Sequence, residues 1–144
     1  MAVLRDVIFL SQDWAEAMIP QGGESIISVT SPGSALADLN DGWRDVLRIQ
    51  FDDVDPNETP PGAFESELAE LSEAQAREIA AFVLASAAHS QTIIVHCKFG
   101  QSRSPAIAKA ICDHYRLPFP PKFRSHNRFV HGLVRKAMLV QSGV

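Results

Sequence analysis

The sequence predicts an α/β fold, with a central and mostly parallel sheet flanked by helices, that forms one domain over residues 1–144. Short runs rich in Val and Ile alternate along the chain with helix-like segments, as they do in parallel sheets whose connections are helices. The chain has neither an internal repeat nor a low-complexity linker that would divide it. Its 144 residues, 46% of them apolar and 21% charged, are enough for one globular core.

Four segments have the composition of strands. The third is the clearest, because Leu47, Ile49 and Phe51 alternate with polar residues and so predict a half-buried strand. The fourth follows a polar break and is short, apolar and rich in β-branched residues, which favours a buried strand. The four expected strands cover residues 3–9, 25–30, 46–51 and 92–95.

Helices are expected between and after these strands. A capping box from Ser72 to Gln75 predicts a helix that continues to about Ala88. The last helix is expected near residues 127–140, because apolar residues recur there at helical spacing. Asn127 is interpreted as the residue that starts this helix.

The most informative segment is the loop that follows the fourth strand. It runs from Cys97 to Arg103, and a helix is expected after it because Ser104 can cap that helix and Pro105 can occupy its first turn. Unpaired amides in a tight loop and at a helix N-terminus favour an anion, and Gly100 allows the backbone angles that such a loop needs. Arg103 adds a planar, permanently charged group that can hold two oxygens of a phosphoryl group. The segment therefore predicts a phosphate-binding loop.

The thiol of Cys97 lies where this loop would act on it. A free thiol has a pKa near 8.5, whereas helix termini and nearby cations lower it to about 3.5–7.5. We therefore expect Cys97 to be a thiolate and a nucleophile, with His96 positioning it by hydrogen bonding. The second cysteine, Cys112, lies on the following helix and is expected to be a small core residue.

This segment resembles the signature loop of cysteine-dependent protein tyrosine phosphatases, since His96 and Cys97 are followed by five residues and then by Arg103 and Ser104. The Ser-Arg-Ser-Pro sequence most resembles the dual-specificity branch. The resemblance implies a phosphatase of that fold that uses no metal and no cofactor. Cys97 would attack the phosphorus and form a phosphocysteine, Arg103 would hold the equatorial oxygens, and Ser104 would stabilise the thiolate as it leaves. Phosphate would be bound mostly through the backbone amides of Lys98, Phe99, Gly100, Gln101, Ser102 and Arg103.

A second chemical group is required, because the leaving oxygen must be protonated as its bond to phosphorus breaks. In the family this acid is an aspartate that follows an earlier strand. Compared with the family pattern of apolar, any, apolar, any, Asp, the third strand puts Asp53 in the position of the acid, and Asp52 and Asp55 are its rivals. An acidic, solvated turn before Pro56 is the alternative interpretation of each of them.

The chain departs from the family in the segment after Asp53. Asp53 and Cys97 are 44 positions apart (97 minus 53), more than we expect in a compact dual-specificity phosphatase. The excess lies in residues 57–70, which include the sequence Pro60-Pro61-Gly62 and are a candidate for a lid or a rim that selects substrate.

The composition limits which partners and which cellular compartment we expect for the protein. No segment is long and apolar enough to span a bilayer, and the first residues do not form a signal-peptide pattern. Two cysteines, one of them an expected thiolate, favour a reducing cytoplasm. The net charge of −4 argues against a nucleic-acid partner, and the basic residues from Lys122 to Lys136 are interpreted as a solvated helix face. The histidines have no metal-ligand spacing, so no metal site is predicted.

The expected partner is a phosphorylated substrate, and the Ser-Arg-Ser-Pro ending resembles that of protein-directed members of the family, which implies a phosphoprotein. Phosphoinositides, RNA 5′-phosphates and small phosphoesters stay open, because they undergo the same chemistry and are selected by the depth and rim of the pocket. A phosphate-binding pseudophosphatase with a misplaced acid is a further alternative. Sulfur transfer and arsenate reduction also use a cysteine in an anion loop. Sulfur transferases have a shorter loop, without the Cys-to-Arg spacing of this chain. Arsenate reduction needs partner cysteines to resolve its intermediate, and Cys112 is the one candidate.

Overall fold

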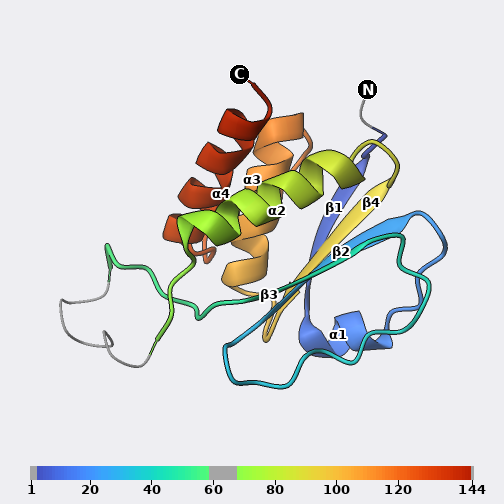
Figure 1. Cartoon of the computed structure of the whole chain (residues 1–144), viewed down its shortest axis with the longest axis horizontal. Helices are drawn as coiled ribbons and strands as arrows, with labels where there is room; N and C mark the ends of the chain where they lie inside the picture. Colours follow the sequence, from blue (N-terminus) through green and yellow to red (C-terminus); the bar gives the residue numbers. More distant parts are fainter. Residues whose placement is uncertain (1–2, 59–67, 144) are drawn as a thin grey trace.

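A computed structural model describes residues 3–58 and 68–143 of the chain. Within these residues one sheet of parallel strands has the order β1-β4-β2-β3 (Figure 1). The strands are β1 (Asp6–Ser11), β2 (Glu24–Thr30), β3 (Val46–Gln50) and β4 (Thr92–Cys97). The predicted α/β class with a central parallel sheet is confirmed.

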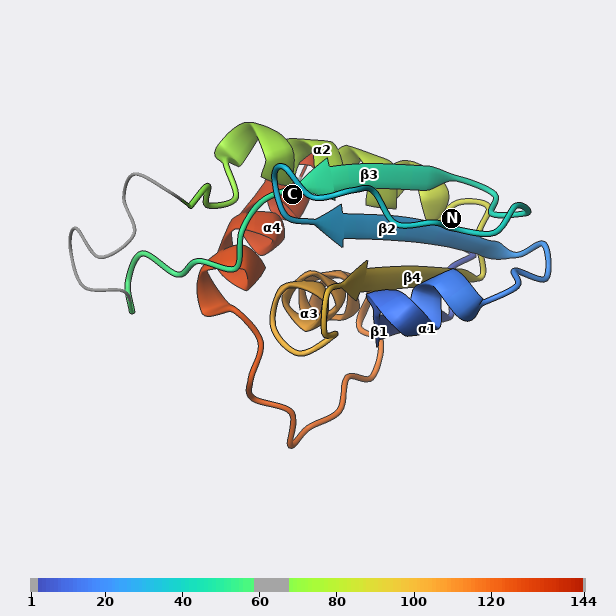
Figure 2. The ribbon, with the colours of Figure 1, turned by 90° about the horizontal axis from the view of Figure 1, so that it is seen from below.

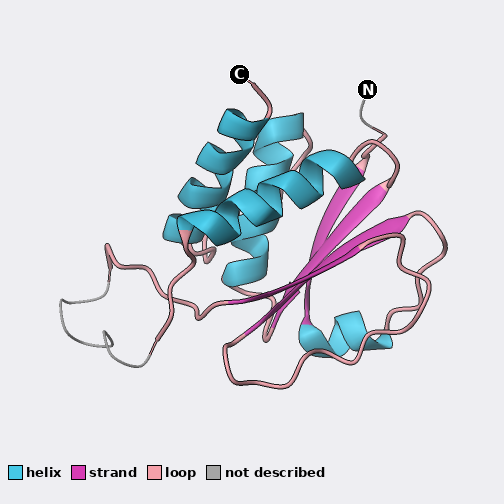
Figure 3. Ribbon diagram, viewed as in Figure 1, coloured by secondary structure: helices cyan, strands magenta, loops and turns pink. Residues whose placement is uncertain are grey.

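The two faces of the sheet are covered by different elements (Figure 3). Alternate residues of a strand point to opposite faces, so neighbouring isoleucines of β2 join different cores. Ile27 belongs to the large core that the sheet shares with three helices, whereas Ile26 packs with Ala15 of a short helix on the other side. The large core involves α2 (Glu73–Ser86), α3 (Arg103–Tyr115) and α4 (Arg128–Gln141), and the short helix is α1 (Gln12–Ala17).

Two of the predicted helix starts are confirmed. The capping box at the start of α2 is present, because the Ser72 hydroxyl accepts from the Gln75 amide while the Gln75 side chain accepts from the Ser72 amide. The Asn127 side chain caps α4 by accepting from the amide of Val130 at 3.0 Å. Both contacts satisfy backbone donors that the first turn of a helix leaves unpaired.

The prediction that Ser104 caps the helix after the loop is wrong. That helix, α3, already begins at Arg103, and its N-cap position is held by Ser102, whose side chain makes no capping bond. The loop turns tightly enough to place Ser104 inside the first turn, where its hydroxyl contacts the Cys97 sulfur instead of a backbone amide. Pro105 follows in the same turn, where its missing N–H costs nothing.

The predicted first strand is displaced at its start. The amides of Val3 and Leu4 donate to the carbonyl of Ala87 and not to a neighbouring strand, so β1 begins at Asp6. The sequence analysis also did not predict α1, which starts directly after β1 with Ser11 as its cap. A six-residue helix is too short to give a readable apolar period.

The carboxyl ends of the parallel strands meet at one edge of the sheet, where sites form in such folds (Figure 2). Ser11, the last residue of β1, is paired with Cys97, the last residue of β4. On the other side of β4 in the sheet, β2 ends at Thr30 and β3 ends at Gln50, and these two residues are paired with each other. The loops that leave these four strands therefore surround Cys97.

Candidate active site

The loop after β4 is held in shape by Gly100. This residue has a φ of 70°, a conformation that L side chains rarely adopt. A Cβ atom on it would lie 2.7 Å from the Leu10 carbonyl carbon and 2.7 Å from the Ser11 nitrogen. The backbone of the loop therefore packs directly on the end of β1, and a side chain here would push it away.

The Cys97 thiol is buried at the floor of this loop, with 3% of the residue exposed. Its sulfur lies 3.1 Å from the Ser104 hydroxyl oxygen and accepts from the Ser104 amide at 3.4 Å. Burial by itself raises the pKa of the thiol. Hydrogen bonds from Ser104 and from the Gly100 amide, together with the Arg103 charge, outweigh burial and hold the pKa of Cys97 below its ordinary value.

The fully buried His96 supports the end of β4. Its Nε2 lies 2.6 Å from the Ser28 hydroxyl oxygen, and its Nδ1 lies 3.3 Å from the Cys97 carbonyl oxygen. Burial lowers the pKa of His96, so the ring is neutral. A carbonyl can only accept, which makes Nδ1 the donor and leaves Nε2 to accept from Ser28. The two contacts fix the strand end that carries the nucleophile.

The guanidinium of Arg103 is anchored on one side only. Its Nη1 donates to the Phe51 carbonyl at 2.9 Å and to the Ser31 hydroxyl at 3.1 Å, although the residue is only 6% exposed. Its Nε is buried and has no hydrogen-bond partner in the described part of the chain. A buried donor without a partner is costly, so this edge of the guanidinium is suited to an anion that occupies the loop.

Of the three rival aspartates, Asp53 contacts the loop. Its Oδ1 accepts from the Ser102 hydroxyl at 2.8 Å and from the Asn127 amide group at 2.9 Å. Asp52 instead accepts from the Ala69 amide at 2.8 Å. Asp55 accepts a hydrogen bond from the backbone amide of Asn57. This local contact fits the acidic turn that was the alternative interpretation of Asp55.

Two residues of the site, Ser31 and Asn127, were not assigned to it from the sequence. Ser31, the first residue after β2, holds Arg103, and nothing in its local sequence distinguishes it from a turn residue. Asn127 joins three segments: it caps α4, and its Nδ2 donates to Asp53 and to the Val54 carbonyl, the latter at 3.0 Å. Its backbone amide donates to the Ser102 carbonyl at 3.1 Å. The capping signal was readable, but the two contacts with the 53–54 turn were not.

The rim of the loop is exposed. Phe99 has 75% of its surface exposed, and Lys98 beside it is also exposed. A pocket that opens next to Arg103 has walls from the start of α1, from the segment at the end of β2 and from the loop after β4. It is lined by Gln12, Thr30, Ser31, Ser34, Ala35, Lys98, Phe99 and Arg103.

The segment expected to form a lid or a rim falls largely on residues 59–67, which lie outside the described residues. Its two described ends lie together. The Asp52 amide donates to the Ala69 carbonyl at 2.7 Å, and the Asp52 carboxylate accepts from the Ala69 amide. Asp52 therefore closes the base of this segment, next to Asp53.

The predicted core role of Cys112 agrees with its position. It is 1% exposed on α3, and burial, together with Asp113, raises its pKa to about 11. Both cysteines are free thiols. The two thiols thus have opposite environments, one suited to a thiolate and one to a neutral thiol.

A comparison of the chain with models of known protein families and with curated proteins finds no match. In residues 3–58 and 68–143, no group of three or more His, Cys, Asp or Glu side chains is arranged to hold a metal ion. None of the helices described has the length and apolar character that crossing a bilayer requires.

Proposed function

We propose that the protein is a cysteine-dependent phosphatase that hydrolyses a phosphomonoester through a phosphocysteine intermediate. The observation that carries the proposal is one seven-residue loop that holds a thiol with a lowered pKa and a buried guanidinium whose Nε has no hydrogen-bond partner among the residues that the structure describes. A thiolate is the nucleophilic form of cysteine, and a guanidinium edge binds two oxygens of a phosphoryl group. The resemblance of the same residues to the phosphatase signature loop supports this assignment.

In the first step the Cys97 sulfur attacks phosphorus, and the bond from phosphorus to the leaving oxygen breaks. Arg103 and the loop amides hold the equatorial oxygens, whose charge is spread in the transition state. Asp53 gives its proton to the leaving oxygen, which departs as an alcohol or phenol. The products of this step are the free alcohol, a phosphocysteine and the Asp53 carboxylate.

In the second step water attacks the phosphocysteine. The Asp53 carboxylate takes a proton from the water as the sulfur–phosphorus bond breaks, which restores the acid for the next cycle. The electron pair of that bond returns to the Cys97 sulfur. Ser104, whose hydroxyl oxygen lies 3.1 Å from this sulfur, donates to the departing thiolate. The net reaction is hydrolysis of the ester to an alcohol and inorganic phosphate.

A phosphoprotein is the proposed substrate class. The exposed Phe99 and Lys98 offer an aromatic and a cationic contact at the rim, where a phosphorylated side chain on a polypeptide would enter. Phosphoinositides, RNA 5′-phosphates and small phosphoesters are the alternative substrates, because the chemistry at phosphorus is the same for all of them. Because the reaction needs a reduced Cys97, we place it in a reducing compartment such as the cytoplasm.

A pseudophosphatase that only binds phosphate is the second candidate considered from the sequence. That alternative rested on a misplaced acid. The hydrogen bond between Asp53 and Ser102, which lies within the phosphate-binding loop itself, favours the active enzyme over it.

Hydrolysis of p-nitrophenyl phosphate by the purified protein tests the proposal, with a chelator present throughout. Activity that is abolished in Cys97→Ser and is inhibited competitively by vanadate is the expected result. A folded Cys97→Ser variant that retains wild-type activity contradicts the proposal. Sulfur transfer would instead depend on thiosulfate or a similar donor and would show no phosphate release.

A further inference from the structure

The charges of the chain are divided between its two parts. Residues 1–78 carry 16 acidic and four basic residues, a balance of −12, whereas residues 79–144 carry nine basic residues and one acidic residue, a balance of +8. The single acidic residue of the second part is Asp113, on α3. The net charge of −4 therefore conceals a strongly basic part that includes α3, α4 and the 116–127 loop between them.

Three of these basic residues, together with two histidines, line a pocket outside the phosphate-binding loop. The 116–127 loop leaves α3 and returns to α4 as an arc below both helices (Figure 2). The pocket lies between this arc and the two helices. We call it the flank pocket, and its basic lining residues are Lys109, Arg124, His126, Arg128 and His131.

The flank pocket has more cationic groups than its one carboxylate can neutralise. Asp113 is already shared, because it lies 3.2 Å from the Lys109 ammonium and accepts from His131 at 2.8 Å. Arg124 and Arg128 are exposed and make no ion pair with any residue of the described ranges. Two guanidinium groups at the pocket are therefore available to an anion from outside.

The surroundings of His126 are consistent with an excess of positive charge at the flank pocket. His126 is buried, and its Nδ1 has no hydrogen-bond partner among residues 3–58 and 68–143. Burial lowers the pKa of His126, and the charges of His131, Arg128 and Lys109 lower it further, against a weaker opposite effect of Asp113. The ring is neutral in this surrounding, so Arg124, Arg128 and Lys109 supply the charge.

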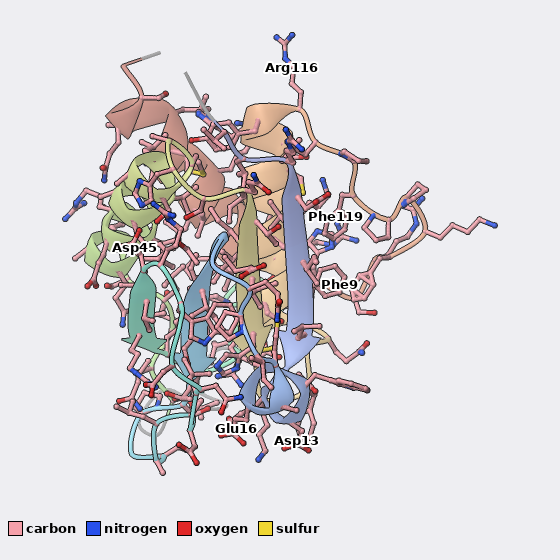
Figure 4. All side chains as sticks on the ribbon, turned by 90° about the vertical axis from the view of Figure 1, so that its right-hand side faces the viewer. Phe9, Asp13, Glu16, Asp45, Arg116 and Phe119 are labelled. Atoms are coloured by element: carbon pink, nitrogen blue, oxygen red, sulfur yellow. The ribbon has the colours of Figure 1, made fainter. Side chains whose placement is uncertain are left out.

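The opposite wall is aromatic and fixed. Phe119 of the 116–127 loop stacks on Phe9 of β1 with ring centroids 5.5 Å apart, and Phe123 meets Phe9 edge-on at 5.1 Å. Figure 4 shows Phe119 lying against Phe9, while Arg116 at the start of the loop points away from the molecule. Lys109 lies 5.9 Å above the Phe119 ring. These contacts hold the arc in place, so the pocket is formed before a ligand arrives.

The flank pocket is connected to the proposed active site through two elements. Lys109 is six residues beyond Arg103 on α3, which is about 9 Å along the helix axis. Arg128 directly follows Asn127, whose side chain holds Asp53. An extended peptide advances about 3.3 Å per residue, so a substrate with its phosphate in the loop would reach the pocket about three to five residues away.

We propose that the flank pocket binds carboxylate side chains of an acidic peptide segment that flanks the phosphorylated residue of a protein substrate. This inference rests on the proposed function. A compact group of cations suits one or two carboxylates, with the peptide backbone lying against the phenylalanines. A long nucleic acid is less well matched, because the acidic part of the chain, at −12, repels an extended run of phosphates.

Two phosphotyrosine peptides test this, one with Glu and one with Gln at the positions three to five residues from the phosphotyrosine. The variant is Arg124→Gln/Arg128→Gln. Its matched control is Arg116→Gln/Lys122→Gln, which removes two exposed charges from the same loop outside the pocket. The measured quantity is kcat/KM for each peptide divided by kcat/KM for p-nitrophenyl phosphate, at low and at physiological salt.

For the Glu peptide we expect this ratio to fall about three- to tenfold in the pocket variant and to change less than twofold in the control, with a smaller effect at higher salt. The ratio for the Gln peptide should stay within about twofold in both variants. An equal fall for both peptides, or no fall for the Glu peptide, overturns the inference.

Direct binding separates this inference from the proposed function. A fluorescent Glu-rich peptide without phosphotyrosine is titrated with wild-type protein and with the two double variants, and anisotropy is recorded. Weaker binding only to the pocket variant supports the acidic-peptide site even if no phosphoester is hydrolysed. If a single-stranded oligonucleotide of equal charge binds more tightly and loses affinity in the pocket variant, the ligand is a nucleic acid and the inference is wrong.

Discussion

The Asn127 side chain donates a hydrogen bond of 2.9 Å to Oδ1 of Asp53, across 74 positions of sequence. Ser102 donates to the same oxygen at 2.8 Å. Both donors use Oδ1, so in the proposed mechanism Oδ2 is the oxygen that would carry the proton. The turn after β3, the loop from Cys97 to Arg103 and the start of α4 are thereby joined at the proposed general acid.

Replacement of Asp53 by Asn should remove this acid. We expect kcat to fall about 100- to 10,000-fold for an alkyl phosphate, with a smaller loss for p-nitrophenyl phosphate, whose leaving group needs less protonation. The basic limb of the pH–rate profile should disappear. Asp52→Asn and Asp55→Asn are the matched controls and should keep that limb. If one of them loses it and Asp53→Asn does not, the acid has been assigned to the wrong residue.

Asn127 should act as a positioning residue for Asp53 as well as a helix cap. Asn127→Ser keeps a capping side chain but is too short to reach Asp53, so stability should change little while kcat falls about tenfold, or ~1.4 kcal/mol. Asn127→Ala should lose the same activity and in addition about 1 kcal/mol of stability. The separation of the two effects is measured by steady-state kinetics and by urea unfolding. An unchanged kcat in Asn127→Ser would show that Asn127 acts only as a helix cap.

The two cysteines should differ in reactivity. The pKa of Cys97 lies below its ordinary value, so its thiolate is present at lower pH than that of a free thiol and disappears as the pH falls through the lowered pKa. Cys112, with a pKa raised to about 11, should not react near neutral pH. Alkylation by iodoacetamide followed against pH should therefore modify Cys97 alone, and Cys97→Ser should be inert. Modification of Cys112 at pH 7 would contradict this.

Ser104→Ala should shift the alkylation profile of Cys97 to higher pH, because a hydrogen bond that stabilises the thiolate is lost. The same change should slow breakdown of the phosphocysteine, since the departing thiolate loses a donor. A burst of p-nitrophenol before the steady state is then expected. A profile that stays in place would mean that the amide contacts and Arg103 alone set the pKa.

Gly100→Ala should displace the loop from the end of β1. The added Cβ would lie 2.7 Å from backbone atoms of Leu10 and Ser11, in a conformation with φ of 70°. We expect a loss of about 2–4 kcal/mol in the free energy of unfolding and a large loss of activity. Gly22→Ala is the control, because Gly22 also has a positive φ but open space around it, and it should lose about 1–2 kcal/mol with activity retained. Equal effects of the two changes would argue against the packing role.

The fold was predictable from local patterns. Alternating apolar residues identified β3, because one face of this strand is more buried than the other. The Ser72 and Gln75 pair identified the start of α2, because the two residues of the capping box are three positions apart. The start of α3 was misplaced by two residues, because Ser104 was predicted as its cap and Ser102 holds that position. The reason is that the Cys97 sulfur, seven positions away, competes for the hydroxyl that would otherwise cap the helix.

The site was predictable only where its residues are neighbours in sequence. Cys97 and Arg103 share one loop, so their spacing carries the signal. Asp53 was one of three rivals, and Ser31 and Asn127 were not assigned to the site. Each of them is joined to the loop by a contact across many positions, which depends on the strand order and on the packing of α4 and not on any local pattern.

The central claim is that phosphate passes through the Cys97 sulfur, and trapping that intermediate tests it most directly. Asp53→Asn is mixed with p-nitrophenyl phosphate, quenched in acid during the steady state, digested and analysed by mass spectrometry. Because the variant lacks the base that activates water, we predict that phosphate accumulates on the peptide containing Cys97 and is absent from Asp53→Asn/Cys97→Ser. Turnover by the single variant with no phosphate on Cys97 at any quench time would contradict the claim.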